Sequence, residues 1–280
     1  MDLPDQPTSV SADSNLLRSF AANVDWIYAG LIRLAESDPN ADTECGLAGR
    51  LLYADELEGA GNVLVVAAKI AGAASLAATD NTRAQSQAIR NGVINCVVPS
   101  VGHALEILQK RSRISNPVAV CVSQPPHVVE HDMAAIGVLP DLLPPGALNA
   151  TRLERFLVHG ARKIEPVSAS HDQTILTWSV DRWPARWLPK LDLVALDCLC
   201  SFQSRHGCTG LDTWSARRWL NHAPRHLGRL ARGMRLLRCP NRVAHDFLGR
   251  VRRLMTAGML DVTVEIDLCS RGELEYHRVA

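Results

Sequence analysis

The chain has 280 residues, enough for one large domain or two ordinary ones, each with its own core. A hydrophobic share of 47% with 21% charged residues excludes a disordered chain, and no apolar run is long enough to predict a membrane span. The first residues lack the basic region and apolar core of a signal peptide. We therefore expect a cytoplasmic protein whose eight cysteines are reduced.

The net charge of +1 conceals a strong asymmetry along the chain. Residues 1–45 carry eight acidic side chains and two arginines, whereas residues 205–253 carry twelve arginines and two aspartates. Such polarity predicts either different partners for the two ends or an interface between them.

The first 45 residues are expected to form an N-terminal helical segment. From about Ser14 to Glu36, apolar residues recur at steps of three and four, which is typical of an amphipathic helix. The run Ser37-Asp38-Pro39-Asn40 ends that pattern.

Short apolar strands then alternate with helices, with short links between them. Strands are expected at 50–54, 74–79, 93–98, 118–123 and 138–142, and helices at 62–71, 81–91, 101–114 and 126–136. This alternation builds a parallel sheet through right-handed crossovers. Residues 46–146 are therefore predicted to be an α/β, Rossmann-like domain with a parallel sheet flanked by helices.

The alternation of strands and helices ends after Pro144-Pro145-Gly146, and residues 147–280 are predicted to be an arginine-rich α+β region. Strands are expected at 175–180 and 262–268, and helices at 151–158, 213–222 and 241–256. The sequence leaves the topology of this region open.

Four segments in the first half carry a family resemblance. They are Ala-Gly-Arg-Leu-Leu at 48–52, Ile-Ala-Gly-Ala-Ala-Ser-Leu-Ala at 70–77, His-Ala-Leu-Glu at 103–106 and Gly-Val-Leu-Pro-Asp-Leu at 137–142. In order and spacing, residues 47–142 resemble the Rossmann-type NAD domain of urocanase. The resemblance covers about a third of the chain and implies a dinucleotide-binding ancestry.

The chain also departs from that family. The family's glycine loop ends Gly-Gly-Ala-Gln, but here the stretch is Leu57-Glu58-Gly59-Ala60-Gly61-Asn62-Val63. Residues 144–149 read Pro-Pro-Gly-Ala-Leu-Asn in place of the family's Asp-Gln-Thr-Ser-Ala-His-Asp, and Pro-Ala-Arg-Trp at 184–187 only weakly echoes its Pro-x-Arg-Ile-Cys-Trp. Urocanases are about twice as long. The resemblance therefore does not imply hydration of urocanate.

Four residues are candidates for holding NAD. Gly59 and Gly61 stand between a strand and a helix, as in a dinucleotide loop, although the third glycine of the usual motif is replaced by Leu64. Asn62 is expected to cap the helix beside a phosphate, and Asp80, at the end of the next strand, to bind a ribose. The alternatives are that the glycines only shape the turn and that Asp80 only caps the following helix. Lys69 is expected to be solvated.

Two further groups stand in the C-terminal half. Cys198, Cys200, His206 and Cys208 could close a zinc site, but the spacing is not a standard one, so we predict no metal and expect buried thiols. Arginines recur at three- and four-residue steps from Arg217 to Arg238 and could line one face. We expect that face to form an internal or homo-oligomeric interface and expect nucleic acid not to be its partner, because no nucleic-acid motif accompanies it.

Two functions follow. The first is a urocanase-related protein that binds NAD and, if catalytic, is a lyase of hydratase type with no assignable acid or base. The alternative is a non-catalytic scaffold or regulatory subunit that binds a protein partner through its basic C-terminal region. For the alternative, charge reversal of Arg229, Arg232 and Arg235 is expected to abolish the interaction.

Overall fold

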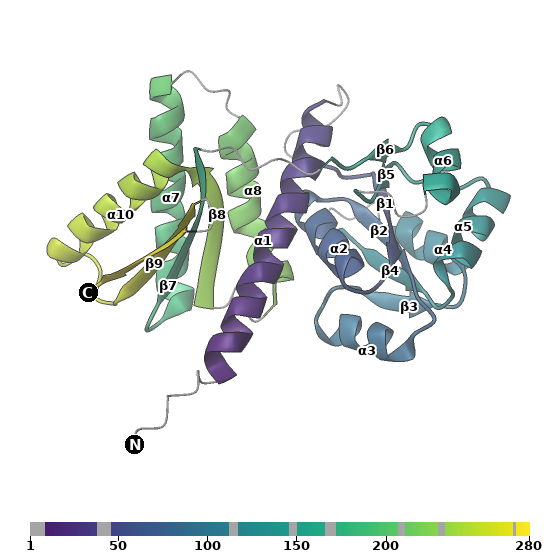
Figure 1. Cartoon of the computed structure of the whole chain (residues 1–280), viewed down its shortest axis with the longest axis horizontal. Helices are drawn as coiled ribbons and strands as arrows, with labels where there is room; N and C mark the ends of the chain where they lie inside the picture. The colour runs from purple at the N-terminus through teal and green to yellow at the C-terminus, as the bar shows by residue number, and fades with distance from the viewer. Residues whose placement is uncertain are drawn as a thin grey trace. The chain divides into compact units, whose positions relative to one another are not determined.

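The computed structural model describes residues 9–37, 46–111, 117–145, 150–165, 172–206, 211–228, 233–270 and 273–280. Contacts divide the chain into two compact units, Val24–Ser168 (the α/β unit) and Met1–Asn23 with Ala169–Ala280 (the C-terminal unit). Helix α1 (Ser9–Glu36), drawn purple in Figure 1, runs through this boundary. Its last part therefore belongs to the α/β unit and its first part to the C-terminal unit.

The α/β unit is built on a six-stranded sheet in the order β3-β4-β2-β1-β5-β6, in which all pairs are parallel. The strands are β1 (Leu51–Glu56), β2 (Ala74–Ala78), β3 (Cys96–Val98), β4 (Ala119–Val122), β5 (Leu142–Leu143) and β6 (Arg162–Lys163). The helices are α2 (Ala60–Ala71), α3 (Thr82–Arg90), α4 (Val101–Arg111), α5 (Pro126–Ala135) and α6 (Ala150–Val158). In Figure 1, α2 and α3 lie on one side of the sheet and α4, α5 and α6 on the other. The predicted parallel sheet flanked by helices is confirmed.

The core of this unit follows from strands that are apolar on both faces, as a sheet covered by helices on both sides requires. All four residues of β4 are buried, and so are the last four of β2. Tyr53 on β1 reaches between α5 and α6, where its hydroxyl lies 3.2 Å from Glu130 Oε1 and its ring 6.4 Å from that of Phe156. Helix α2 ends at Gly72 in the left-handed conformation, as the sequence predicts.

Three local expectations in this unit are wrong. Helix α3 is capped by Asn81, whose Oδ1 accepts from the Arg83 and Ala84 amides, so Asp80 is not the cap. Asn62 lies inside the first turn of α2, which has Gly59 at its cap position. The strand expected at 138–142 is only Leu142–Leu143, because Pro140 has no N–H for the ladder.

The C-terminal unit holds a second sheet, antiparallel, in the order β10-β9-β7-β8. Its elements are β7 (Gln173–Val180), α7 (Pro184–His206), α8 (Leu211–His226), β8 (Met234–Pro240), α10 (Asn241–Thr256), β9 (Val264–Ser270) and β10 (Glu273–Val279). Alternation puts Leu176 and Trp178 of β7 on the face that α10 covers, where the Trp178 and Phe247 rings are 5.1 Å apart. The expected α+β character is therefore present.

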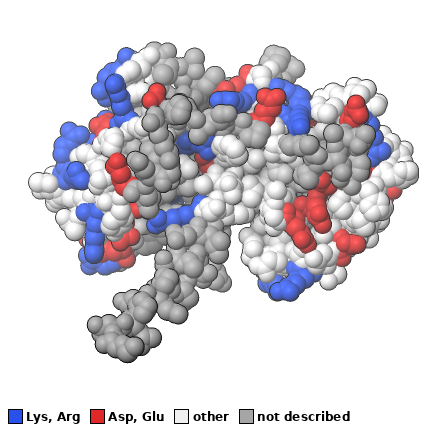
Figure 2. All heavy atoms as spheres, in the orientation of Figure 1, with Lys and Arg blue, Asp and Glu red and all other residues white. Residues whose placement is uncertain are grey.

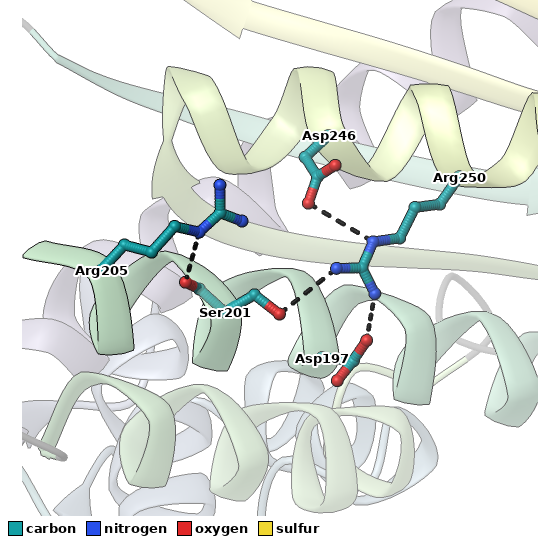
Figure 3. A network of polar contacts seen from close by, with 5 residues as sticks. All are labelled: Asp197, Ser201, Arg205, Asp246 and Arg250. Atoms are coloured by element: carbon teal, nitrogen blue, oxygen red, sulfur yellow. Dashed lines mark hydrogen bonds and ion pairs between the residues drawn. The ribbon is translucent and has the colours of Figure 1, made fainter.

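A polar network joins α7 to α10 on the outside of this unit (Figure 3). The Arg250 guanidinium on α10 contacts Asp197 and Ser201 of α7 and lies 3.4 Å from Asp246. Arg205 in turn donates to the Ser201 carbonyl at 3.0 Å. The Arg250 contacts hold the second half of α7 against α10, whereas the Arg205 bond lies within α7. None of the helices in the described part of the chain combines the length and apolarity needed to cross a membrane.

Candidate nucleotide site at the carboxyl edge of the parallel sheet

The structure brings the four proposed NAD residues to one edge of the parallel sheet. Gly59, Gly61 and Asn62 follow β1, and Asp80 follows its neighbour β2. The chain leaves β1 toward β2 but leaves β5, on the other side of β1, toward β6. Ligands of open α/β sheets bind at the carboxyl ends of strands where connections diverge in this way.

Glycine is needed at positions 59 and 61 for different physical reasons. A Cβ on Gly61 would lie 1.8 Å from the Glu56 carbonyl oxygen, so this glycine is required for α2 to start directly against the end of β1. Gly59 has φ of +47°, and no atom lies within 4 Å of the place that a Cβ would take, so it serves the turn itself and faces open space. Gly61 is thus explained by helix–strand packing without any ligand.

Three amide groups in and beside this turn donate to carbonyl groups of the chain. Leu57 N–H donates to the Ala78 carbonyl at 3.0 Å, Glu58 N–H to Glu56 at 2.9 Å, and Gly61 N–H to Glu58 at 2.8 Å. A pyrophosphate cradle needs such N–H groups directed at the ligand. Three of the donors near the turn are therefore not directed outward.

Glu58 closes the gap between the turns that follow β1 and β2. Its Oε1 accepts from Asn81 Nδ2 at 2.8 Å, while Asn81 Oδ1 caps α3. In a dinucleotide site the adenosine ribose lies between these two turns. The bond thus spans the place where the ribose would bind, and Asp80 remains exposed beside it.

The same edge is acidic and tied together by neutral hydrogen bonds. Gln85 is buried and donates to the Thr79 carbonyl at 2.8 Å and to Ser123 Oγ at 2.9 Å, which joins α3 to the ends of β2 and β4. Glu56, Glu58 and Asp80 are exposed, and the sequence from 51 to 68 contains no lysine, arginine or histidine. Figure 2 shows a group of acidic side chains on the α/β unit. Carboxylates suit ribose hydroxyls but oppose a pyrophosphate.

The residues present therefore fit NAD only in part. Acceptors for a ribose are in place at Glu58 and Asp80, whereas the Leu57, Glu58 and Gly61 amides are bound within the chain and this stretch of sequence carries no basic side chain for a pyrophosphate. No pair at this edge can be assigned as a general acid and base.

Lys69 is not solvated, contrary to expectation. Its side chain is buried, and Nζ donates to the Gly92 carbonyl at 2.9 Å and to that of Val93 at 3.3 Å. Burial lowers the pKa of this ammonium to about 8. The lysine thus binds the chain just after α3 to α2 and has a structural role.

The structure does not gather the cysteine and histidine residues considered for zinc. Cys198 and Cys200 are two residues apart on α7 and so lie on different sides of the helix, and burial raises the pKa of the Cys198 thiol to about 12. His206 stacks on Phe202 at 4.2 Å, and Cys208 lies outside the described residues. Among the described residues, no three potential ligands come together.

The expectation that the arginines from 217 to 238 share one face is wrong. Residues 234–240 form strand β8, so Arg235 and Arg238, three positions apart, point to opposite faces of the sheet. Arg235 packs against α7 with its side chain 12% exposed, and its Nε lies 3.0 Å from Asp192. Its pairing is internal, whereas Arg229 and Arg232 lie outside the described residues.

Sequence reasoning missed a basic and aromatic surface at the start of α7. Arg182, Trp183, Arg186 and Lys190 are exposed there, around the buried ring of Trp187. The signal is present in the sequence as Asp-Arg-Trp-Pro-Ala-Arg-Trp-Leu-Pro-Lys at 181–190, a stretch that sequence comparison alone marks only as a weak family echo.

Comparisons with known proteins add no family to this description. No protein-family model matches the chain, and no curated protein matches it significantly. The urocanase resemblance therefore rests on the four sequence segments alone.

Proposed function

We propose that this protein is a urocanase-related, Rossmann-like protein that acts as a non-catalytic scaffold or regulatory subunit. Its α/β unit would be the rigid platform and its C-terminal unit the surface that contacts a protein partner. The observation that supports this most is the Glu58–Asn81 hydrogen bond of 2.8 Å, which spans the place of a ribose, together with turn amides that bond within the chain. A fold that persists while its site is filled fits a platform better than an enzyme.

The test is mass spectrometry of small molecules released when the purified protein is denatured without added cofactor. We expect no dinucleotide and no change of melting temperature when NAD is added. NAD released in stoichiometric amount would overturn the scaffold proposal. Urocanate is expected to keep its ultraviolet absorbance in the presence of the protein.

NAD binding is the second candidate function, because one observation favours it. Asp80 is exposed at the carboxyl end of β2, and the space over Gly59 is open. In this proposal Glu58 releases Asn81, and Glu58 and Asp80 accept hydrogen bonds from the ribose. When bound, NAD would supply an electrophilic nicotinamide ring.

The variant Glu58→Ala separates the two candidates. If Glu58 and Asp80 bind the ribose, the parent shows a thermal shift with NAD that Glu58→Ala and Asp80→Ala each reduce. If the Glu58 side chain only closes the site, Glu58→Ala gains a thermal shift with NAD that the parent lacks. If neither the parent nor the Glu58→Ala variant shows a thermal shift with NAD, the turn itself does not accept a pyrophosphate.

A further inference from the structure

The first half of α7 has an exposed side on which apolar and basic residues alternate. We call this surface the α7 face; it consists of Arg182, Trp183, Arg186, Pro189, Lys190 and Leu193. Trp183 is 53% exposed and Leu193 is 66% exposed, which is unusual for side chains of this size. Arg182 and Trp183 directly precede α7, and helical steps of three and four place Arg186, Pro189, Lys190 and Leu193 along one side of it.

The cations of this face are held in place by a buried ring. Trp187 is only 4% exposed, and the Arg186 guanidinium and the Lys190 Nζ lie 4.9 Å and 4.2 Å from its ring centroid. Cation–π contacts of this kind fix two otherwise flexible side chains. The charged groups are therefore partly ordered before any partner arrives, which lowers the entropy cost of binding.

Trp183 occupies a position that would suit glycine better. Its φ is +51°, in the left-handed region, where the backbone of a bulky residue is strained. Its carbonyl accepts from the Arg186 and Trp187 amides at 2.9 Å and 3.1 Å, a backbone contribution that glycine would also make. The exposed indole, with the Arg182 guanidinium 5.3 Å from its centroid, is therefore not needed to start the helix.

Carboxylates next to the face already have partners in this unit. Asp181 accepts from the Thr263 amide at 3.0 Å and pairs with Arg182 at 3.6 Å. Asp197, one turn beyond Leu193, contacts Arg250 (Figure 3). Arg186 and Lys190 thus present positive charge to solvent.

We propose that the α7 face docks an acidic segment of a partner protein in which carboxylates alternate with apolar side chains. The inference rests on the scaffold function proposed above and names its contact surface and partner chemistry. Charge complementarity selects an acidic partner. Tryptophan and arginine are the residues that most often dominate the energy of protein interfaces. The spacing of apolar residues between cations suits an extended or helical segment that carries both kinds of side chain.

The experiment measures fluorescence anisotropy of a labelled peptide in which Glu and Leu alternate, titrated with the whole chain. A second peptide with Gln in place of each Glu tests the charge requirement. The double variant Arg186→Glu with Lys190→Glu should weaken binding at least about tenfold. The matched control, Arg217→Glu with Arg225→Glu, changes two exposed arginines of α8 by the same charge and should leave affinity within about twofold.

A second variant separates docking from folding. Trp183→Gly should weaken peptide binding by about tenfold while the melting temperature stays the same or rises, since glycine relieves the strained backbone. Equal losses in the two double variants, or no binding of the Glu peptide, would overturn the proposal. So would tighter binding of an oligo-dT strand or of phosphatidylserine vesicles that the same α7 substitutions abolish.

This outcome is independent of the cofactor test. NAD found in the purified protein would defeat the scaffold proposal whatever the peptide does. If the purified protein contains no cofactor and does not bind the peptide, the scaffold proposal stands and the proposal for the α7 face is wrong.

Discussion

The two units use their polar side chains in opposite ways. At the carboxyl edge of the parallel sheet, polar groups bond to one another, as Glu58 does to Asn81 and Gln85 to Ser123. On the α7 face, Arg186 and Lys190 lie against a buried ring and keep their charges at the surface. Internal bonding stabilises a fold, whereas an ordered and unneutralised charge is available to a partner. The difference is why we propose a contact surface on the C-terminal unit and not at the carboxyl edge of the parallel sheet.

The largest effect should come from a charge that is buried and not from one on the α7 face. Arg235→Ala leaves the Asp192 carboxyl without its cation, where the two side chains are only 12% and 13% exposed. We expect a loss of about 3–5 kcal/mol in the free energy of unfolding at pH 8, measured with urea. Arg186→Ala removes an exposed arginine for comparison, and it should change the free energy of unfolding by less than about 0.5 kcal/mol.

The loss for Arg235→Ala should shrink at pH 5. Burial raises the pKa of Asp192 to about 6 in the intact protein, so at pH 5 its carboxyl is largely neutral and needs the cation less. A loss that is equal at both pH values would contradict this account. Charge reversal at Arg235 is therefore a folding experiment and not a probe of partner binding.

The next effect concerns the glycine turn. Gly61→Ala should cost about 2–3 kcal/mol, because its Cβ would overlap the Glu56 carbonyl and force α2 away from β1. Gly59→Ala, at φ of +47° with open space around it, should cost about 1–2 kcal/mol. Urea unfolding of the two variants checks the order. The reverse order would mean that the turn conformation, and not helix–strand packing, limits stability here.

The last effect, similar in size to that of Gly59→Ala, is a pH dependence that Asp192→Asn removes. The folded pKa of about 6 lies above the unfolded value of about 3.9, so this carboxyl contributes stability fully below pH 4 and loses it as pH rises through 6. Between pH 4 and pH 7 the parent should lose on the order of 2 kcal/mol relative to Asp192→Asn. Parallel stability curves for the two proteins would contradict the burial of an ionised carboxyl at this position.

The parallel sheet could be predicted because each of its strands and helices has a recognisable local sequence pattern. Apolar runs such as that of β2 and closing glycines such as Gly72 are visible without any tertiary information. Helix α7 was missed because Pro189 lies inside it, and proline normally ends a helix. Strand β8 was missed because arginines three residues apart imitate a helical face, while pairing with β7 imposes an extended backbone.

For the candidate site, the sequence predicts which residues come together but not what they contact. The positions of Gly59, Gly61 and Asp80 at one edge follow from the order of the strands, so the sequence predicts them together. The contacts of Gly61 with Glu56 and of Glu58 with Asn81 do not follow from the sequence. They depend on how α2 packs and on the pairing of β1 with β2. The sequence therefore located the edge but not its internal hydrogen bonds.

Helix α1 limits how the protein can be divided. The boundary between Asn23 and Val24 falls within a continuous helix, so no flexible link exists at that point along the described chain. In the C-terminal unit, Arg18 of this helix lies 2.5 Å from the buried carboxylate of Asp267, which also accepts from Thr177. A fragment that begins after residue 168 would expose that carboxylate and lose its cation. Separate expression of the two halves should therefore yield a less stable C-terminal unit, and evolution could exchange one half only by replacing a helix that both share.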